Sequence, residues 1–380
     1  MNQPIRILNL FMIMNRGGAE TLVMNYYRKI DRSKVQFDFM VHRQERGAYE
    51  DEIEALGGRI YRMSPISLST LSTYRKELRD FFNTHTEYKV LHAHMSEMAY
   101  FIFNEAEKHN IPVRICHAHN APVFFSETMV EKIKRIPREI LARLIRKNAT
   151  DFFTCSQIAG EWLFGKTISK KMLFMRNAVD ATSFVYDKTK ADEVRTKMGW
   201  NGKTVIGHVG RFNPQKNHTF LIDIFELYHR KNKNAILVLI GAGFLENSIK
   251  QKVQDKGLVQ SVEFLGSRND IPYLLQGIDL FLFPSLYEGL PVSLIEAQSA
   301  GIPCVVSDTI SEQAKLTEDY FPVSLKSPLS VWKDTIESAL QIGKKDTYQE
   351  VKSHGFDVSE NASWLCDYYL TKSNTDYKKK

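Results

Sequence analysis

Two glutamates, Glu288 and Glu296, stand eight positions apart around a predicted helix start. Pro291 suits the first position of a helix, so Glu296 is expected about 8 Å along the helix axis from it. A helix N-terminus offers unpaired N–H groups and a partial positive charge, which favours a phosphate there. Carboxylates accept hydrogen bonds from hydroxyl groups on either side of such a phosphate. The spacing therefore suits a sugar joined through a diphosphate to a ribose.

Two cations, Arg211 and Lys216, follow another apolar run, Val205 to Val209. Cations at the end of a strand stabilise negative charge that grows on a departing diphosphate. An Arg-x4-Lys pair is also common on ordinary protein surfaces. On the residues alone, both readings stay open.

Four histidines in the first half of the chain lie at the ends of two predicted strands: His92, His94, His117 and His119. Alternation along a strand points neighbours i and i+2 the same way, so a metal site is one interpretation. No acidic or cysteine ligand accompanies the histidines, and a structural role is the alternative. We expect no metal site here.

A glycine pair, Gly17 and Gly18, follows the first predicted strand and opens a helix. Glycines at this place let the backbone approach a phosphate or a sugar closely, and they also suit a plain tight turn. A second glycine pair, Gly241 and Gly243, superficially suggests a dinucleotide fingerprint. Glu246 occupies the position of the third glycine, so a nicotinamide enzyme is rejected.

These residues need elements that place them together, and the chain offers two series of apolar runs alternating with helical patterns. The expected strands are Ile5 to Met12, Phe37 to Val41, Arg59 to Met63, Val90 to His94, Val113 to His117, Phe152 to Cys155, Leu173 to Met175, Val205 to Val209, Ala235 to Ile240, Val262 to Leu265, Leu280 to Phe283 and Pro303 to Ser307. Such alternation predicts α/β domains with doubly wound parallel sheets, whose ligands bind at the carboxyl ends of the strands. A charged, poorly periodic segment at 181–203 suggests the boundary between two domains.

Composition excludes several classes of protein. With 43% hydrophobic and 25% charged residues, the chain of 380 residues is ordinary for a globular protein with two α/β domains. Its four cysteines have no CxxC spacing, which predicts free thiols rather than a zinc site. The apolar run Ile7 to Met14 is too short to span a bilayer, and no cleavage signal follows it. We expect a cytoplasmic protein.

The net charge of +7 is concentrated in residues 1–183, which hold 27 Lys and Arg against 20 Asp and Glu. Part of this excess lies in residues 128–147, with seven basic residues against two acidic ones on an amphipathic pattern. Pro137 is expected to break the pattern and to begin a second helix. Such a stretch either lies against anionic lipid at the inner face of the membrane or packs on its domain as a solvated helix.

One run of residues carries a specific resemblance. It comprises Pro284, Ser285, Glu288, Gly289, Glu296, Ala297, Gly301 and Pro303. It closely resembles the signature of the family-4 retaining glycosyltransferases, which have the GT-B fold. The resemblance implies two Rossmann-like domains that face a central cleft, here expected at 1–183 for the acceptor and at 184–358 for the nucleotide-sugar donor. It also implies that a helix in 359–380 returns to the N-terminal domain, before a frayed tail.

The same resemblance implies roles for individual residues. Glu288 is placed near the donor sugar and Glu296 on the ribose, while Arg211 and Lys216 bind the diphosphate. His119 is the best match to the family's active-site histidine, with His117 as its rival. The other expected donor-binding residues are Gly17, Gly18, Arg268, Gly289 and Leu290.

The implied activity is transfer of a sugar from a nucleotide diphosphate sugar, by default a UDP-sugar. The acceptor would be a glycan or a polyprenyl-linked glycan of bacterial surface polysaccharide. No acidic DxD pair stands at a suitable strand end, so neither a cofactor nor a metal is expected. Two alternatives are a nucleotide-sugar epimerase of the same architecture and a non-enzymatic nucleotide or nucleic-acid binding protein, suggested by the pI of about 9.0. An epimerase would change the sugar without any acceptor, and no recognisable nucleic-acid module is present.

Overall fold

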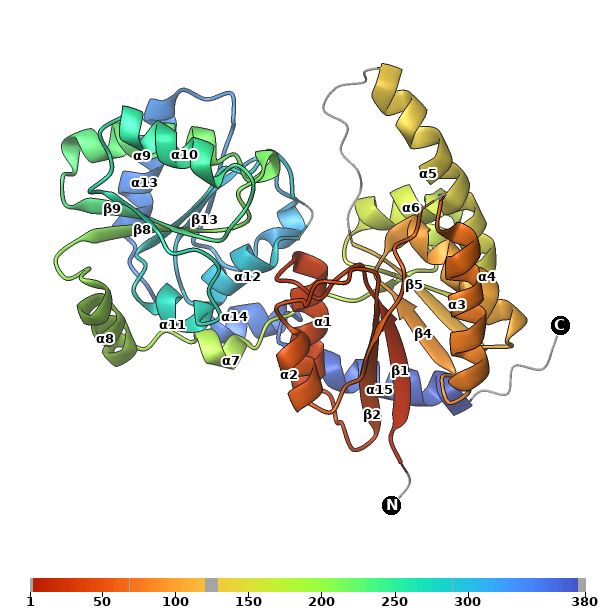
Figure 1. Ribbon diagram of the computed structural model, residues 1–380. Coiled ribbons are helices and arrows are strands. Elements are labelled where there is room, and N and C mark those ends of the chain that lie inside the picture. Colours follow the sequence, from red (N-terminus) through yellow and green to blue (C-terminus); the bar gives the residue numbers. More distant parts are fainter. Residues whose placement is uncertain (1–2, 68, 120–128, 289, 375–380) are drawn as a thin grey trace. The chain divides into compact units, whose positions relative to one another are not determined.

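The structure is a computed structural model that describes residues 3–67, 69–119, 129–288 and 290–374, with the backbone alone for 129–136. Contacts divide the chain into two compact units, drawn in Figure 1. The first unit consists of Met1–Arg176 and Val358–Lys380, and the second of Asn177–Asp357. Each unit is an α/β domain in its own right, so the predicted fold class of two Rossmann-like domains is confirmed.

The first unit is built on a seven-stranded parallel sheet with the order β3-β2-β1-β4-β5-β6-β7. Its strands are β1 (Ile5–Leu10), β2 (Val35–Val41), β3 (Ile60–Arg62), β4 (Val90–Ala93), β5 (Val113–Ala118), β6 (Asp151–Thr154) and β7 (Leu173–Phe174). Its helices are α1 (Gly18–Lys29), α2 (Glu50–Ala55), α3 (Leu71–Thr84), α4 (Tyr100–Lys108), α5 (Met129–Asn148), α6 (Gln157–Ser169) and α15 (Val358–Asn374). Helices α3 to α6 bury an apolar core against one face of the sheet, while α1 and α15 pack together on the other.

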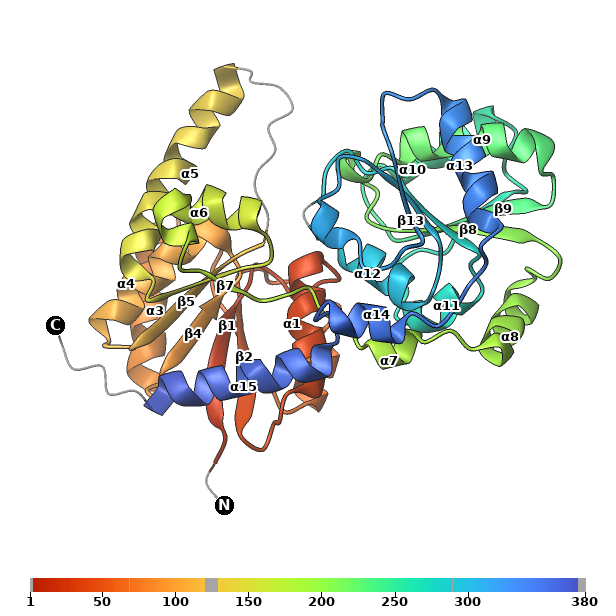
Figure 2. The same cartoon turned by 180° about the vertical axis from the view of Figure 1, so that it is seen from behind.

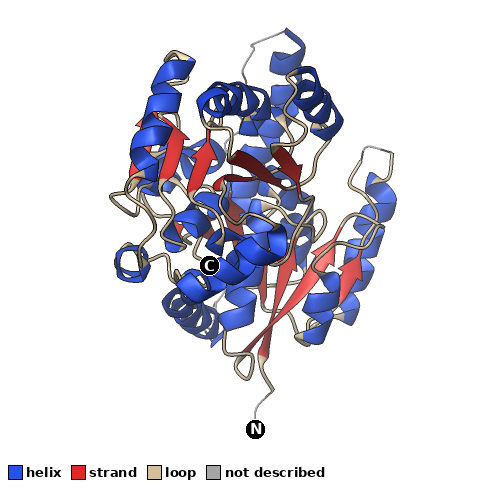
Figure 3. Ribbon diagram, turned by 90° about the vertical axis from the view of Figure 1, so that its left-hand side faces the viewer, coloured by secondary structure: helices blue, strands red, loops and turns tan. Residues whose placement is uncertain are grey.

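The second unit holds a six-stranded parallel sheet with the order β10-β9-β8-β11-β12-β13. Its strands are β8 (Thr204–Val209), β9 (Ala235–Ile240), β10 (Val262–Phe264), β11 (Leu280–Phe283), β12 (Cys304–Ser307) and β13 (Tyr320–Val323). Its helices are α7 (Ala181–Phe184), α8 (Lys188–Met198), α9 (His218–Lys231), α10 (Glu246–Asp255), α11 (Ile271–Gln276), α12 (Val292–Ser299), α13 (Leu329–Leu340) and α14 (Tyr348–Ser353). Two buried clusters cover the two faces of this sheet, so helices flank strands on both sides, as Figure 3 shows in blue and red.

Strand β13 was not expected from the sequence. It pairs in parallel with β12 and forms one edge of the sheet. Pro322 interrupts its apolar pattern, and a proline is tolerated in a strand mainly at a sheet edge, because it cannot donate to a ladder on both sides. The proline therefore hides the strand from pattern reasoning without preventing it from forming.

The first domain boundary lies between Arg176 and Asn177 rather than after residue 183. The N–H of Val179 donates to the carbonyl of Phe356 at 3.0 Å, and Val179 forms an isolated parallel bridge with Asp357. Ala181 in α7 is fully buried in the core of the second unit. Pairing with the end of the second unit thus draws in a segment that looks like a linker in the sequence.

Helix α15 returns to the first unit and runs across its sheet, as Figure 2 shows from behind. It contacts α1, β1, β2 and β4. The hydroxyl of Tyr368 donates to Asp151 at 2.6 Å, and the hydroxyl of Tyr369 lies 2.6 Å from Nδ1 of His92. These aromatic side chains therefore complete the covering of the first sheet.

Helix α5 runs unbroken from Met129 to Asn148, so the expected break at Pro137 does not occur. Proline removes one backbone hydrogen bond, but the turns that follow are anchored from outside the helix. Nε of Arg138 donates to Glu97 at 2.5 Å, and Nε of Arg146 donates to the carbonyl of Leu163 at 2.8 Å. These tertiary contacts outweigh the lost bond.

All four cysteines are buried and unpaired, as expected. Across the described part of the chain, we find no helix with the length and apolar character needed to cross a membrane.

Candidate active site

The second sheet reverses direction between β8 and β11, and the candidate site lies at the carboxyl ends of these two strands. From β8 the chain moves outward to β9 and β10, and it then returns to the other side of β8 with β11. A crevice forms at such a switch point, where ligands of open α/β sheets usually bind. Arg211 and Lys216 follow β8, and Glu288 follows β11.

Lys216 and Glu288 meet directly in this crevice. Nζ of Lys216 lies 2.7 Å from Oε1 of Glu288, and the two side chains are 13% and 9% exposed. The same Nζ lies 4.3 Å from the centre of the Phe283 ring, at the end of β11. Burial of this degree makes a charge pair much stronger than on an open surface, because water screens it less. The pair therefore places a cation and a carboxylate at defined positions.

The loop after β8 is shaped to present Lys216. Oδ1 of Asn213 accepts a hydrogen bond from the backbone N–H of Lys216 at 3.2 Å. Asn217 has a φ of 54°, a left-handed conformation that asparagine tolerates better than most residues. Its side-chain amide donates to the carbonyl of Pro284 at 3.1 Å. Lys216 is thus held between two asparagines that were not singled out in the sequence.

The loop after β11 is fixed by contacts from three other segments. The N–H of Leu286 donates to the carbonyl of Gln215 at 2.8 Å, and Nε2 of Gln215 donates to the carbonyl of Tyr287 at 3.1 Å. Thr309 donates to the carbonyl of Ser285 at 3.1 Å. Asn177, which is buried, donates to the carbonyl of Leu290. Asn177 and Gln215 could not be recognised from the sequence because they lie 113 and 72 residues from their partners.

Two buried histidines, His208 and His218, line the base of this loop. Nδ1 of His208 lies 2.9 Å from the carbonyl of Leu282, and His218 stacks on Phe212 with ring centres 4.2 Å apart. Burial lowers the pKa of His218 to about 4, and the positive charge of Lys216 lowers it further. Burial also lowers the pKa of His208 well below its usual value. Both rings are therefore neutral at pH 7, and the positive charge of the site comes from lysine and arginine.

The other predicted residues of the second unit lie around the pair in different ways. Arg211 is exposed, and its guanidinium has no partner within the described part of the chain. Glu296 is half-buried in α12, whose N-cap Pro291 supplies no capping hydrogen bond. Arg268 follows the edge strand β10 and makes two hydrogen bonds to Asp270, at 2.8 and 2.6 Å, so this arginine is not joined to the pair.

Gly289 lies outside the described residues, whereas Leu290 is buried at 7% exposure. Gly301, the glycine that closes the family signature, has a φ of +67°. A Cβ at this position would lie 1.7 Å from the carbonyl oxygen of Lys345. The fold, rather than a ligand, therefore requires glycine there.

The predicted residues of the first unit lie at the carboxyl ends of its own strands. Gly17 is the N-cap of α1 and is buried, while a Cβ at Gly18 would meet no described heavy atom within 4 Å. His119 is half-buried, and its carbonyl accepts a hydrogen bond from the thiol of Cys155 at 2.9 Å. Burial lowers the pKa of its imidazole to about 3. His117 is fully buried, so His119 is the more accessible of the two rivals.

Residues 190–349 match the family described as Glycosyl transferases group 1. Over 381 residues the chain is 35% identical to the putative glycosyltransferase EpsF of Bacillus subtilis, and the match covers 98% of each protein. The chain belongs to the glycosyltransferases of group 1. Capsular polysaccharide biosynthesis glycosyltransferase CapH of Staphylococcus aureus is 25% identical to this glycosyltransferase over 375 residues, covering 97% of it and 99% of CapH.

The structure of Anabaena Alr3699/HepE in complex with UDP-glucose superimposes on this glycosyltransferase with a TM-score of 0.72. The superposition covers 97% of each chain at 18% identity, which shows that the fold is shared. Both the GT-B fold and the glycosyltransferase class predicted from the signature are therefore confirmed. Membership of this family sets aside the two alternatives, an epimerase and a binding protein without enzyme activity.

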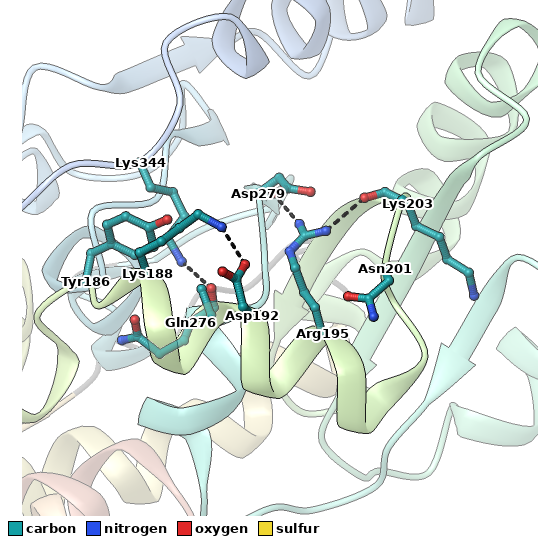
Figure 4. A pocket seen from close by; sticks show the side chains of 11 residues that line it. Tyr186, Lys188, Asp192, Arg195, Asn201, Lys203, Gln276, Asp279 and Lys344 are labelled. Atoms are coloured by element: carbon teal, nitrogen blue, oxygen red, sulfur yellow. Dashed lines mark hydrogen bonds and ion pairs between the residues drawn. The ribbon is translucent and has the colours of Figure 1, made fainter.

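A cavity of about 400 Å³ lies elsewhere in the second unit of this glycosyltransferase, as Figure 4 shows. It is lined by Lys203 and Asp279, which precede β8 and β11, so it lies at the amino ends of the strands and away from Lys216. The cations around it are already engaged. Arg195 pairs with Asp279, and Nζ of Lys344 donates to two carbonyls at 2.8 Å each. This cavity is therefore not the donor site.

Proposed function

We propose that this glycosyltransferase moves a sugar, with retention of anomeric configuration, from a UDP-sugar to a glycan or polyprenyl-linked acceptor. The observation that carries the proposal is the half-buried Lys216–Glu288 pair at the β8/β11 switch point. A diphosphate between a sugar and a nucleoside needs a cation, and the sugar needs a hydroxyl acceptor. This pair offers both within 2.7 Å.

Departure of the nucleoside diphosphate is the step that the site is suited to promote. The bond between the anomeric carbon and the phosphate oxygen breaks, and the diphosphate leaves with the electron pair. Lys216, Arg211 and the N–H groups at the start of α12 stabilise the growing negative charge. The acceptor hydroxyl attacks the same face of the sugar, and its proton passes to an oxygen of the leaving phosphate.

Glu288 orients the hydroxyl groups of the donor sugar, and Glu296 holds the ribose. When the donor binds, its phosphate competes with Glu288 for Lys216, so the carboxylate is released toward the sugar. Arg268 is assigned to the nucleotide base, and the backbone around Gly289 and Leu290 to the diphosphate. In the first unit, Gly17 and Gly18 are assigned to the diphosphate and His119 to the sugar.

The choice of donor and of process rests on the relatives. UDP-glucose is the ligand in the Anabaena structure, and CapH acts in capsular polysaccharide biosynthesis. We assign the chain to the assembly of a bacterial surface polysaccharide. Lysine, arginine and helix N–H groups supply the positive charge in this proposal, and transfer itself needs neither a metal nor another cofactor.

A screen of nucleotide sugars by thermal shift in EDTA tests this proposal. One UDP-sugar is expected to raise the melting temperature, and Glu296→Ala is expected to weaken its binding about tenfold or more by removing the charged hydrogen bonds to the ribose. Glu337→Ala, a change of another helical glutamate in the same unit, serves as the control. Stabilisation by no nucleotide sugar, or only after a divalent metal is added, contradicts the proposal.

Helix α5 is proposed to rest on an anionic membrane surface, where a lipid-linked acceptor would be found. Ala142 and Ile145 are buried against the first unit, while Ile140 is 51% exposed. Arg143 and Lys147 are also exposed. The described half of the helix therefore keeps one side in the core and offers an apolar side chain and two cations outward.

Liposome co-sedimentation measures this contact. More protein is expected to bind to vesicles with anionic lipid than to neutral ones, and Arg143→Gln with Lys147→Gln is expected to reduce the bound fraction, since each lost cation weakens binding by about 1 kcal/mol. The paired control is Lys231→Gln with Lys233→Gln in the second unit, both exposed. Equal binding to neutral and anionic vesicles would show that α5 is a solvated helix.

A further inference from the structure

The histidine cluster, defined as His92, His94 and His117, holds several buried polar atoms that the transfer reaction does not use. One nitrogen from each ring lies within 4.8 Å of the others. Nε2 of His92, Nε2 of His94 and both ring nitrogens of His117 are buried without a hydrogen-bond partner among the described residues. An unpaired buried polar atom is unfavourable, so a cluster of four calls for a ligand or for water.

The sheet brings these atoms to one place. His92 and His94 lie two residues apart around the end of β4, and His117 lies on the neighbouring β5, so all three side chains project from the same face. Asn9 is the register partner of His92 on β1, and its Oδ1 is also buried without a partner among the described residues. Phe11 stacks on His94 with ring centres 4.5 Å apart and covers the cluster with an apolar ring.

Two of the rings are already oriented by contacts at their other nitrogen. Nδ1 of His92 lies 2.6 Å from the hydroxyl of Tyr369, and Nδ1 of His94 lies 2.9 Å from Nε2 of His119. With the proton on each Nδ1, both contacts become N–H donors and each Nε2 presents a lone pair. Histidines that bind metals are held in this way, with one nitrogen donating and the other coordinating.

We propose that His92, His94 and His117 form a binding site for one divalent transition-metal ion of the zinc type. Three imidazoles with an open fourth position are a known ligand set for Zn²⁺ and related ions, whereas Mg²⁺ and Ca²⁺ prefer oxygen ligands. Zinc–nitrogen bonds of about 2.0–2.1 Å require the nitrogens to approach to about 3.4 Å, which small side-chain rotations provide.

The ion has a structural role rather than a role in sugar transfer. It joins β4 to β5, and through the contact of His92 with Tyr369 it also holds α15 on the sheet. Sequence reasoning argued against a metal because no acidic or cysteine ligand stands nearby. The structure changes that judgement by showing three unpaired imidazoles, which need no further protein ligand.

Cobalt titration tests the site, because Co²⁺ replaces Zn²⁺ and gives strong visible absorption when four-coordinate. The full chain, freed of metal by a chelator that is then removed, is expected to take up one equivalent of Co²⁺, which Zn²⁺ displaces. His117→Phe keeps an aromatic ring in place and is expected to abolish this absorption. His354→Gln, which changes an exposed histidine of the second unit, leaves it unchanged.

A second variant covers the case in which His117→Phe does not fold. Tyr369→Phe removes only the hydroxyl that orients His92 and is expected to weaken Co²⁺ binding about tenfold, measured against a chromophoric chelator. The proposal is overturned when the folded protein takes up no Co²⁺, when the folded His117→Phe variant binds as well as the original chain, or when folded Tyr369→Phe binds with unchanged affinity. Because the readout is metal binding, its failure leaves the donor-binding test unaffected.

Discussion

Lys216→Ala is expected to lower kcat for sugar transfer by about two to three orders of magnitude. Loss of one preorganised group that stabilises transition-state charge typically costs about 10²–10³ in rate. The amine of Lys216 is held by Glu288 at 2.7 Å and by a loop capped at Asn213, so it needs little reorganisation as the diphosphate departs. Steady-state kinetics with a UDP-sugar donor separates the effect on kcat from the effect on KM.

Lys252→Ala is the matched control for this variant. Lys252 belongs to the same unit, is also half-buried, and pairs with Asp223 at the same distance of 2.7 Å. Its removal breaks a comparable ion pair away from the switch point and is expected to leave kcat within about twofold, because the pair has no part in charge stabilisation. Equal losses in both variants would mean that Lys216 acts only through stability.

Glu288→Gln is expected to lower kcat about a hundredfold while changing the affinity for the nucleoside diphosphate little. The amide keeps the shape of the side chain but removes the charge, and its NH₂ group cannot accept hydrogen bonds from the sugar hydroxyls. Free UDP carries no sugar, so its binding does not depend on this carboxylate. Calorimetry with UDP and kinetics with the UDP-sugar together test the two halves of this expectation.

The double variant, Lys216→Ala with Glu288→Gln, measures the coupling of the pair. Residues in direct contact rarely act additively, so the combined loss in kcat is expected to be smaller than the product of the two single losses. Asp223→Asn combined with Lys252→Ala is the corresponding control. Strict multiplication of the two single effects would contradict a shared role at the diphosphate.

The neutral histidines of the second unit explain why charge at the site is carried by so few residues. His208 and His218 are buried next to the loop that holds Lys216, and burial lowers the pKa of both. A protonated histidine would repel Lys216 and would cost free energy of desolvation. The site therefore keeps a single buried cation in contact with its single carboxylate, with Arg211 exposed beside them.

Much of the architecture could be predicted from local pattern. Strands β9 and β11 were predicted with their observed ends, because short apolar runs bounded by polar turns need little context. The signature around Glu288 and Glu296 predicted the strand, loop and helix that the structure contains. Where pattern and packing disagreed, packing prevailed: α5 continues through Pro137, and the segment after Arg176 joins the second unit.

The sequence by itself determined the fold class, the family and the kinds of side chain available at the strand ends. These depend on periodicity and short motifs, which act over a few residues. Only the tertiary structure decided which side chains meet. Lys216 and Glu288 are 72 residues apart, and His92 and Tyr369 are 277 residues apart. Such pairs are set by the order of strands in a sheet and by the helix that returns to cover it, because burial of the whole apolar surface, and not any local pattern, selects that order.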